Sequence, residues 1–258
     1  METRPFGKTG SLATRLCYGT GLMNPRRFNI AAREGAELIR YAIDAGLNFV
    51  DTAIGYQTHA HVALAMKGLQ RSSVIINTKI NARDAATARS QIPTCLRELG
   101  VDYVDSMMMH GIRSAEDFEA RQPVLDELCK AKDRGHVRLV GASTHVFGEP
   151  AVSRLVDDPR IDIILALIND TGHGLLSGTY AGHVELLKKA HDKGIFVVSM
   201  KVLGEGYYAD DAEPHIRNVF GYDWVDAVNL GMSNRAQVDM AIKIANGEAV
   251  AAELGSLM

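Results

Sequence analysis

The stretch Ile163-Ile164-Leu165-Ala166-Leu167 is an unbroken apolar run, and Val74-Ile75-Ile76 is another. Strands that are covered on both faces have this pattern, whereas a sheet with one wet face alternates apolar and polar residues. Such runs recur along the chain, and longer amphipathic stretches lie between them. The alternation of strand and helix patterns predicts a parallel α/β architecture.

The recurrence predicts a closed barrel rather than an open sheet. Gly19-Thr20-Gly21-Leu22-Met23-Asn24 lacks the third glycine of a dinucleotide-binding fingerprint, which argues against a Rossmann sheet. With no Pro- or Ser-rich linker, we expect a single domain over residues 1–258 with the (β/α)8 TIM-barrel fold. The predicted strands are eight: Thr14–Tyr18, Asn48–Thr52, Val74–Lys79, Tyr103–His110, Val137–Ala142, Asp162–Leu167, Phe196–Lys201 and Asp226–Leu230.

Four glycines are predicted to end helices. Gly46, Gly100, Gly135 and Gly194 each close an amphipathic stretch and precede the next apolar run. A glycine in the left-handed conformation is the commonest residue just past a helix C-terminus.

The composition narrows the classes of function. A net charge of −3 gives no electrostatic reason to expect nucleic acid. The sequence shows neither a secretory leader nor an apolar run of about 18 residues that could span a bilayer. Cys17, Cys95 and Cys129 are widely separated, so we expect buried thiols rather than a metal or redox site. These features predict a cytoplasmic protein that acts on small molecules, and they leave its oligomeric state open.

Ionisable residues follow three successive predicted strands. Asp51 ends the second strand, Tyr56 lies in the loop after it, Lys79 ends the third and His110 ends the fourth. Catalytic groups of a (β/α)8 barrel come from these strand ends. An ammonium beside a phenol lowers its pKa, a carboxylate makes the buried ammonium tolerable, and a histidine can orient a carbonyl oxygen. The set therefore predicts proton transfer to a carbonyl, with Tyr56 as the donor.

The string Gly46-Leu47-Asn48-Phe49-Val50-Asp51-Thr52-Ala53-Ile54-Gly55-Tyr56 resembles the signature of the aldo-keto reductase family. That resemblance implies an Asp, Tyr, Lys and His catalytic tetrad, which Asp51, Tyr56, Lys79 and His110 match. Further matching stretches are spread over the chain: Arg4–Gly10, which resembles a cap over the barrel floor, Leu96–Asp105, Gly135–Ser143, Met200–Gly206, which is similar to a bacterial branch, and Gly231–Gln237.

The resemblance implies a nicotinamide cofactor, usually NADPH, with NADH the alternative. The sequence departs from the family pattern at Leu165, Ile168 and Ala241, where family members often have a carboxamide-binding glutamine, a stacking aromatic residue and an adenine-contacting asparagine. The residues that it implies for cofactor binding are Gly19, Thr20, Asp51, Ser143, Thr144, Lys201, Leu203, Gly204, Ser233, Asn234 and Gln237.

Other interpretations stay open at this point. Lys79 could act as a Schiff-base nucleophile, as in barrel aldolases, or the barrel could bind the cofactor as a sensor without catalysis. His59-Ala60-His61 has the spacing of two metal ligands, but no carboxylate partner is evident, and we expect a solvated or helix-capping role. The predicted function is an NAD(P)-dependent oxidoreductase that interconverts a carbonyl and an alcohol.

Overall fold

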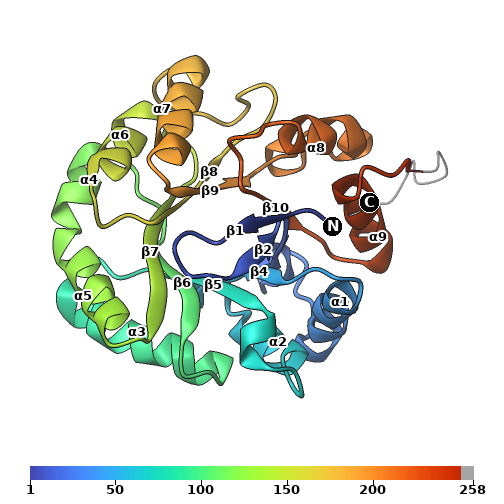
Figure 1. Cartoon of the computed structure of the whole chain (residues 1–258), viewed down its shortest axis with the longest axis horizontal. Helices are drawn as coiled ribbons and strands as arrows, with labels where there is room; N and C mark the ends of the chain where they lie inside the picture. Colours follow the sequence, from blue (N-terminus) through green and yellow to red (C-terminus); the bar gives the residue numbers. More distant parts are fainter. Residues whose placement is uncertain (251–258) are drawn as a thin grey trace.

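The apolar runs pair as parallel strands and close into a barrel in the order β10-β3-β4-β5-β6-β7-β8-β9. A computed structural model describes residues 1–250 and shows this barrel ringed by helices (Figure 1). The predicted (β/α)8 fold is therefore confirmed over these residues; residues 251–258 of the predicted domain lie outside them. The barrel strands are β3 (Leu16–Gly19), β4 (Phe49–Asp51), β5 (Ile75–Ile80), β6 (Val104–Met109), β7 (Val137–Thr144), β8 (Ile163–Leu167), β9 (Phe196–Met200) and β10 (Ala227–Gly231).

Amphipathic helices pack their apolar faces on the outside of the barrel. Each of the glycines predicted to end a helix has a positive φ, from 68° at Gly100 to 98° at Gly46. The helices are α1 (Ala32–Asp44), α2 (His59–Ala65), α3 (Ala85–Leu99), α4 (Ala115–Ala120), α5 (Gln122–Asp133), α6 (Glu149–Asp157), α7 (Tyr180–Asp192), α8 (Ala212–Phe220) and α9 (Arg235–Ala245).

The predicted strand Thr14–Tyr18 is wrong as a single element. The chain first forms an antiparallel hairpin of β1 (Thr3–Pro5) and β2 (Leu12–Thr14), and only then enters the barrel as β3. Arg15 separates the two strands, because its guanidinium is buried and donates to the carbonyl oxygens of Tyr222 and Val225. These bonds pair part of the buried charged group and hold it between the two strands.

The hairpin closes the bottom of the barrel, as the N-terminal resemblance implies. Phe6 is fully buried between Phe49 and Phe196, with ring centroids 5.4 and 4.9 Å away in edge-to-face geometry. Met108 packs inside the barrel with these rings, whereas Met107 and Met109 pack outward under the helices. Side chains therefore fill the lower barrel and leave its upper end for the site.

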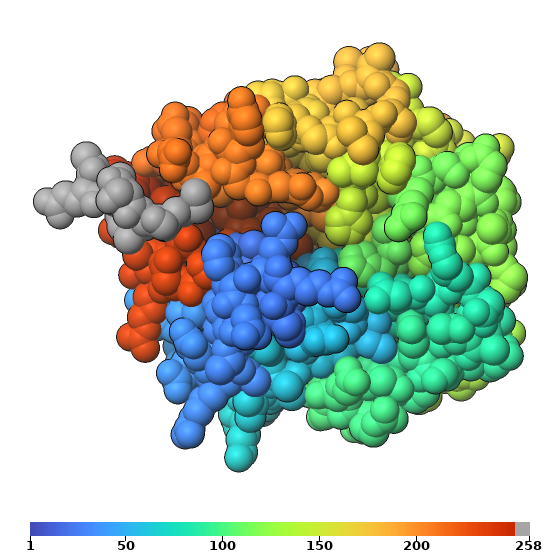
Figure 2. Space-filling view, turned by 180° about the vertical axis from the view of Figure 1, so that it is seen from behind, coloured from blue at the N-terminus to red at the C-terminus, as the bar shows by residue number. Residues whose placement is uncertain are grey.

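The upper end is open. Polar loops extend there past the strand ends, including those that follow β8 and β9. Figure 2 shows this face, which is hollowed between the blue segment that follows β3 and the orange segment that follows β9. Within residues 1–250, no helix has the length and apolarity to cross a membrane.

Candidate active site

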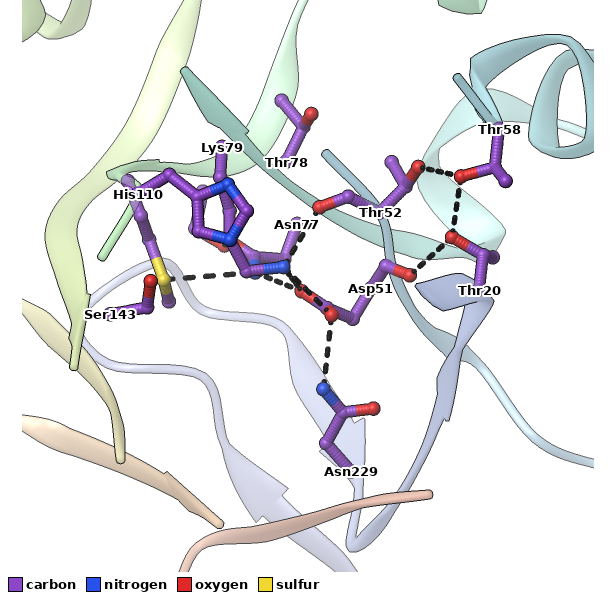
Figure 3. Close-up of polar contacts among 12 residues, drawn as sticks. Thr20, Asp51, Thr52, Thr58, Asn77, Thr78, Lys79, His110, Ser143 and Asn229 are labelled. Atoms are coloured by element: carbon purple, nitrogen blue, oxygen red, sulfur yellow. Dashed lines mark hydrogen bonds and ion pairs between the residues drawn. The ribbon is translucent and has the colours of Figure 1, made fainter. Parts of the chain in front are cut away.

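A buried ion pair lies at the centre of the upper barrel. Lys79 Nζ is 2.6 and 2.8 Å from the two carboxylate oxygens of Asp51, and it also donates to the carbonyl oxygen of Thr52 at 2.9 Å (Figure 3). Lys79 is fully buried and Asp51 nearly so. Burial by itself would lower the pKa of Lys79, but the carboxylate of Asp51 and the phenol of Tyr56 raise it, and the net direction is upward. Lys79 is therefore an ammonium.

Two asparagines complete the hydrogen bonding of the carboxylate. Asn77 Nδ2 donates to one oxygen of Asp51 at 2.6 Å, and Asn229 Nδ2 donates to the other at 3.0 Å (Figure 3). Neither residue was predicted from the sequence. The available signal was a polar residue inside an apolar strand pattern, two positions before Lys79 in one case and between Val228 and Leu230 in the other.

Tyr56 lies directly above this pair, in a short 3-10 turn, Ile54–Tyr56. Lys79 Nζ is 4.8 Å from the centroid of the Tyr56 ring, and Gly21 lies close enough that a Cβ there would be 3.6 Å from the ring. Burial raises the pKa of Tyr56, Lys79 lowers it and Asp51 raises it, with a net upward direction. The expectation that Lys79 would bring this pKa below its ordinary value is wrong, because burial outweighs the ammonium.

His110 follows β6 and lines the same space. Its ring lies 5.4 Å from the Tyr56 ring, and its Nδ1 is 2.9 Å from Asn81 Oδ1. Burial lowers the pKa of His110 to about 2, and electrostatic repulsion by Lys79, His145 and Arg121 contributes to the same shift. The imidazole is therefore neutral at physiological pH. Thus the four residues predicted for catalysis do converge at one point.

A cleft of about 540 Å³ opens beside His110. It is large enough for a small-molecule substrate. Its lining is Asn81, His110, Gly111, Ile112, Arg113, His145, Val146, Phe147 and Lys201. Asn81 and His145 were not predicted from the sequence, because they follow strand ends in segments with no pattern that predicts their shape.

The two histidines of the His59-Ala60-His61 string are neither solvated nor caps, so that expectation is wrong. His59 is buried and lies within hydrogen-bond distance of Thr78 Oγ1 and a Glu98 carboxylate oxygen, while His61 Nε2 contacts the carbonyl oxygen of Ile30. Both rings point inward beneath α2 and tie that helix to its neighbours. In residues 1–250 no group of three or more His, Cys, Asp or Glu side chains could hold a metal ion.

The hydroxyl groups predicted to contact the cofactor are partly committed elsewhere. Thr20 Oγ1 donates to the carbonyl oxygen of Asp51 at 3.0 Å, next to Gly19, which ends β3. Ser143 is fully buried and its Oγ accepts from the backbone of Gly111, while Thr144 Oγ1 donates to the carbonyl oxygen of Phe147. The structure therefore does not present the Thr144 hydroxyl to the cleft.

The remaining predicted contacts lie on two segments past the strand ends. Lys201 lines the cleft and pairs with Glu205 at 2.5 Å, and Leu203 and Gly204 follow it in a tight turn with a positive φ at Gly204.

The second segment is the start of α9. Asn234 caps this helix by accepting from the backbone of Gln237, and Ser233 donates to the side-chain oxygen of Gln237. The positive end of the helix dipole, with Arg235 as the first residue of the helix, suits a phosphate group.

Known proteins have sequences similar to this chain. The sequence model of the Aldo/keto reductase family matches residues 15–221. L-Galactose dehydrogenase of Arabidopsis thaliana is 25% identical over 230 residues, which cover 83% of this chain and 69% of that protein. 2,5-Diketo-D-gluconic acid reductase B of a Corynebacterium is 28% identical over 166 residues, which cover 62% of this chain and 53% of that protein.

Solved structures agree on the fold. A Pseudomonas aeruginosa structure assigned to the aldo-keto reductases superposes with a TM-score of 0.80 over 95% of this chain and 94% of that chain, at 22% identity. An aldo-keto reductase in complex with NADPH superposes with a TM-score of 0.73 over 94% of this chain and 82% of that chain, at 18% identity. Because the family model matches most of this chain, the chain belongs to the aldo/keto reductase family of NAD(P)H-dependent oxidoreductases.

Proposed function

We propose that this enzyme reduces an aldehyde or ketone to an alcohol, or catalyses the reverse, with Tyr56 as the group that exchanges the proton. The observation that carries the proposal is the position of the Tyr56 ring, 4.8 Å from the Lys79 ammonium and 5.4 Å from the His110 ring, beside a cleft. Reduction of a carbonyl leaves negative charge on oxygen, so a nearby acid speeds the reaction. A phenol with a raised pKa is protonated at neutral pH and can serve as that acid.

The ion pair beneath Tyr56 supports this role. The positive charge of Lys79 stabilises a phenolate once Tyr56 has given up its proton, and Asp51 keeps the ammonium charged. All three N–H groups of Lys79 have acceptors on Asp51 or Thr52. A Schiff-base nucleophile must be a free neutral amine, so this geometry argues against the aldolase alternative.

NADPH is the proposed cofactor, with NADH the alternative, and it supplies the hydride when bound. The N-terminus of α9, capped by Asn234 with Ser233, Gln237 and Arg235 around it, fits the phosphate of the adenosine end. Toward the cleft, the proposed contacts are Gly19, Thr20, Asp51, Ser143, Thr144, Lys201, Leu203 and Gly204. Of these, Thr144 would contact the cofactor through its backbone, because its hydroxyl is turned away.

Removal of the Tyr56 hydroxyl tests the proposal. We expect Tyr56→Phe to lower kcat by at least about a hundredfold, the usual contribution of a general acid, with cofactor affinity almost unchanged. Turnover is measured on a panel of aldehydes, ketones and sugars with NADPH and NADH, and affinity by cofactor fluorescence.

Tyr103→Phe is the matched control, because it removes a phenol that stacks on Arg71 at the opposite end of the β-strands. Retention of more than a few per cent of kcat in Tyr56→Phe would exclude Tyr56 as the acid. Cofactor binding by the wild type without oxidation by any carbonyl of the panel would favour the sensor alternative.

A further inference from the structure

Asn81 and His110 face each other across neighbouring barrel strands. The register of β5 and β6 pairs Asn77 with Ser106 and Lys79 with Met108. Asn81 and His110 lie two residues beyond Lys79 and Met108, just past the two strand ends. Side chains alternate along a strand, so this spacing keeps both on the inward side. Their side chains meet, with Asn81 Oδ1 2.9 Å from His110 Nδ1.

The backbone of His110 is held in place from two sides. Its N–H donates to the carbonyl oxygen of Ile80 at 2.9 Å, and its own carbonyl oxygen accepts from Arg121 Nη1 at 3.1 Å. Arg121 is almost fully buried, so this anchor is shielded from water. With the backbone anchored, the contact with Asn81 Oδ1 orients the ring so that Nδ1 lies toward Asn81.

Asn81 is held equally closely at its backbone. Its N–H donates to Gln91 Oε1 at 2.9 Å. Gly55, next to Tyr56, allows the amide to sit there, because a Cβ at position 55 would lie 2.5 Å from Asn81 Nδ2. Among residues 1–250, Asn81 Nδ2 has no hydrogen-bond partner, so the amide can turn by 180° without breaking another bond.

The imidazole of His110 carries a single proton. Its pKa is lowered to about 2 by burial and then by Lys79, His145 and Arg121. A neutral imidazole donates from one nitrogen and accepts at the other, and the partner of one nitrogen decides which. The groups that line the cleft or act on the ring are Tyr56, Lys79, Arg113, Arg121, His145 and Lys201, and Asp51 pairs with Lys79.

We propose that Asn81 is a positioning residue that sets the tautomer of His110. With the amide oxygen toward Nδ1, as in the structure, the proton lies on Nδ1 and Nε2 can accept from the O–H of an alcohol. With the NH2 group turned toward Nδ1, the proton lies on Nε2, which can then donate to a carbonyl oxygen. The ring proton exchanges through water at the cleft. The inference rests on the proposed function, in which His110 contacts the substrate oxygen.

Asn81→Asp separates this role from a structural one. A carboxylate only accepts, so it holds the proton on Nδ1 and leaves Nε2 without the proton that a carbonyl needs. We expect kcat/KM for carbonyl reduction to fall at least about tenfold at pH 8, with cofactor affinity unchanged. The carboxylate also raises the pKa of His110, and an imidazolium donates from both nitrogens. The ratio of variant to wild-type kcat/KM therefore rises as the pH falls.

Asn81→Leu is the matched variant of similar size without hydrogen bonding. It is expected to lose activity with a ratio to the wild type that does not change with pH. The proposal would be overturned if both variants lost the same fraction of kcat/KM and this fraction did not change with pH. Wild-type activity of Asn81→Asp at pH 8 would also overturn it.

A spectroscopic measurement decides the question without turnover. The 15N shifts of the His110 ring, identified by their loss in His110→Gln, report its tautomer and pKa. In Asn81→Asp we expect the Nδ1–H form and a pKa raised by at least about one unit, because the two groups are in hydrogen-bond contact. Ring shifts that titrate as in the wild type would contradict the assignment of Asn81. If no carbonyl is reduced by the wild type, the proposed function fails while this test of Asn81 still stands.

Discussion

The Asp51 carboxylate accepts four hydrogen bonds, two from Lys79 and one each from Asn77 and Asn229. A buried ion pair recovers the cost of leaving water only when its remaining donors and acceptors are also paired. The asparagines satisfy this condition on the carboxylate side, and the Thr52 carbonyl satisfies it on the ammonium side. Both charges can therefore persist beneath Tyr56.

Asp51→Asn is expected to reduce the free energy of unfolding by about 3–5 kcal/mol, because it leaves the Lys79 ammonium buried without a counter-charge. The measurement is urea unfolding followed by circular dichroism. Asp44→Asn is the control, since Asp44 pairs with Arg40 on the exposed surface of α1, where such pairs contribute little. Equal stability of the two variants would show that the Asp51–Lys79 pair is not a buried charge pair.

Individual elements were predicted from the sequence with unequal success. Continuous apolar runs such as Ile163–Leu167 identify strands well, because both faces of a barrel strand are apolar. The prediction of the first strand failed because the hairpin and a barrel strand adjoin at Arg15 without a turn signal.

Within the site, Asp51, Lys79 and His110 were predicted because they stand at strand ends. Asn77 and Asn229 were missed, because their role depends on cross-strand register, which a single strand does not encode.

Loss of the α9 cap tests the proposed phosphate site at the level of an element. Asn234→Ala removes the acceptor for the Gln237 N–H and is expected to cost about 1 kcal/mol of stability. It should also weaken binding of NADPH, measured by fluorescence titration, because the helix N-terminus would fray where a phosphate binds.

Asp84→Ala provides the matched control. Asp84 caps α3 in the same way, by accepting from the Thr87 N–H, but belongs to none of the proposed cofactor contacts. It should lose stability comparably and keep its cofactor affinity. Equal cofactor affinities in both variants would place the phosphate elsewhere.

The barrel as a whole is layered along its axis. Aromatic rings fill the floor, the Asp51–Lys79 pair with its asparagines lies above them, and the Tyr56 ring lies next to His110, which lines the cleft. The apolar floor excludes water from below the ion pair, which strengthens the electrostatic effect of Lys79 on Tyr56. Buried polar groups of this kind also make the stability of the molecule depend on pH.

Acid is expected to destabilise the fold before its carboxylates are protonated. The pKa values of His59, His110, His145 and His183 are all lowered, chiefly by burial, to about 4 for His145 and about 2 for His110. In the unfolded chain these rings take up protons below a pH of about 6.5. The unfolded state then binds more protons than the native state, so the free energy of unfolding decreases as the pH falls from about 6.5 toward the lowered values.

Urea unfolding at pH 7 and pH 5 measures this loss, with few carboxylates titrating in that interval. His145→Gln should show a smaller loss than the wild type, because one buried ring that resists protonation has been removed. His136→Gln replaces an exposed ring and should lose as much stability as the wild type. Equal stability of the wild type at pH 5 and pH 7 would show that the fold does not hold these imidazoles neutral. It would also contradict the neutral His110 on which a choice between two tautomers depends.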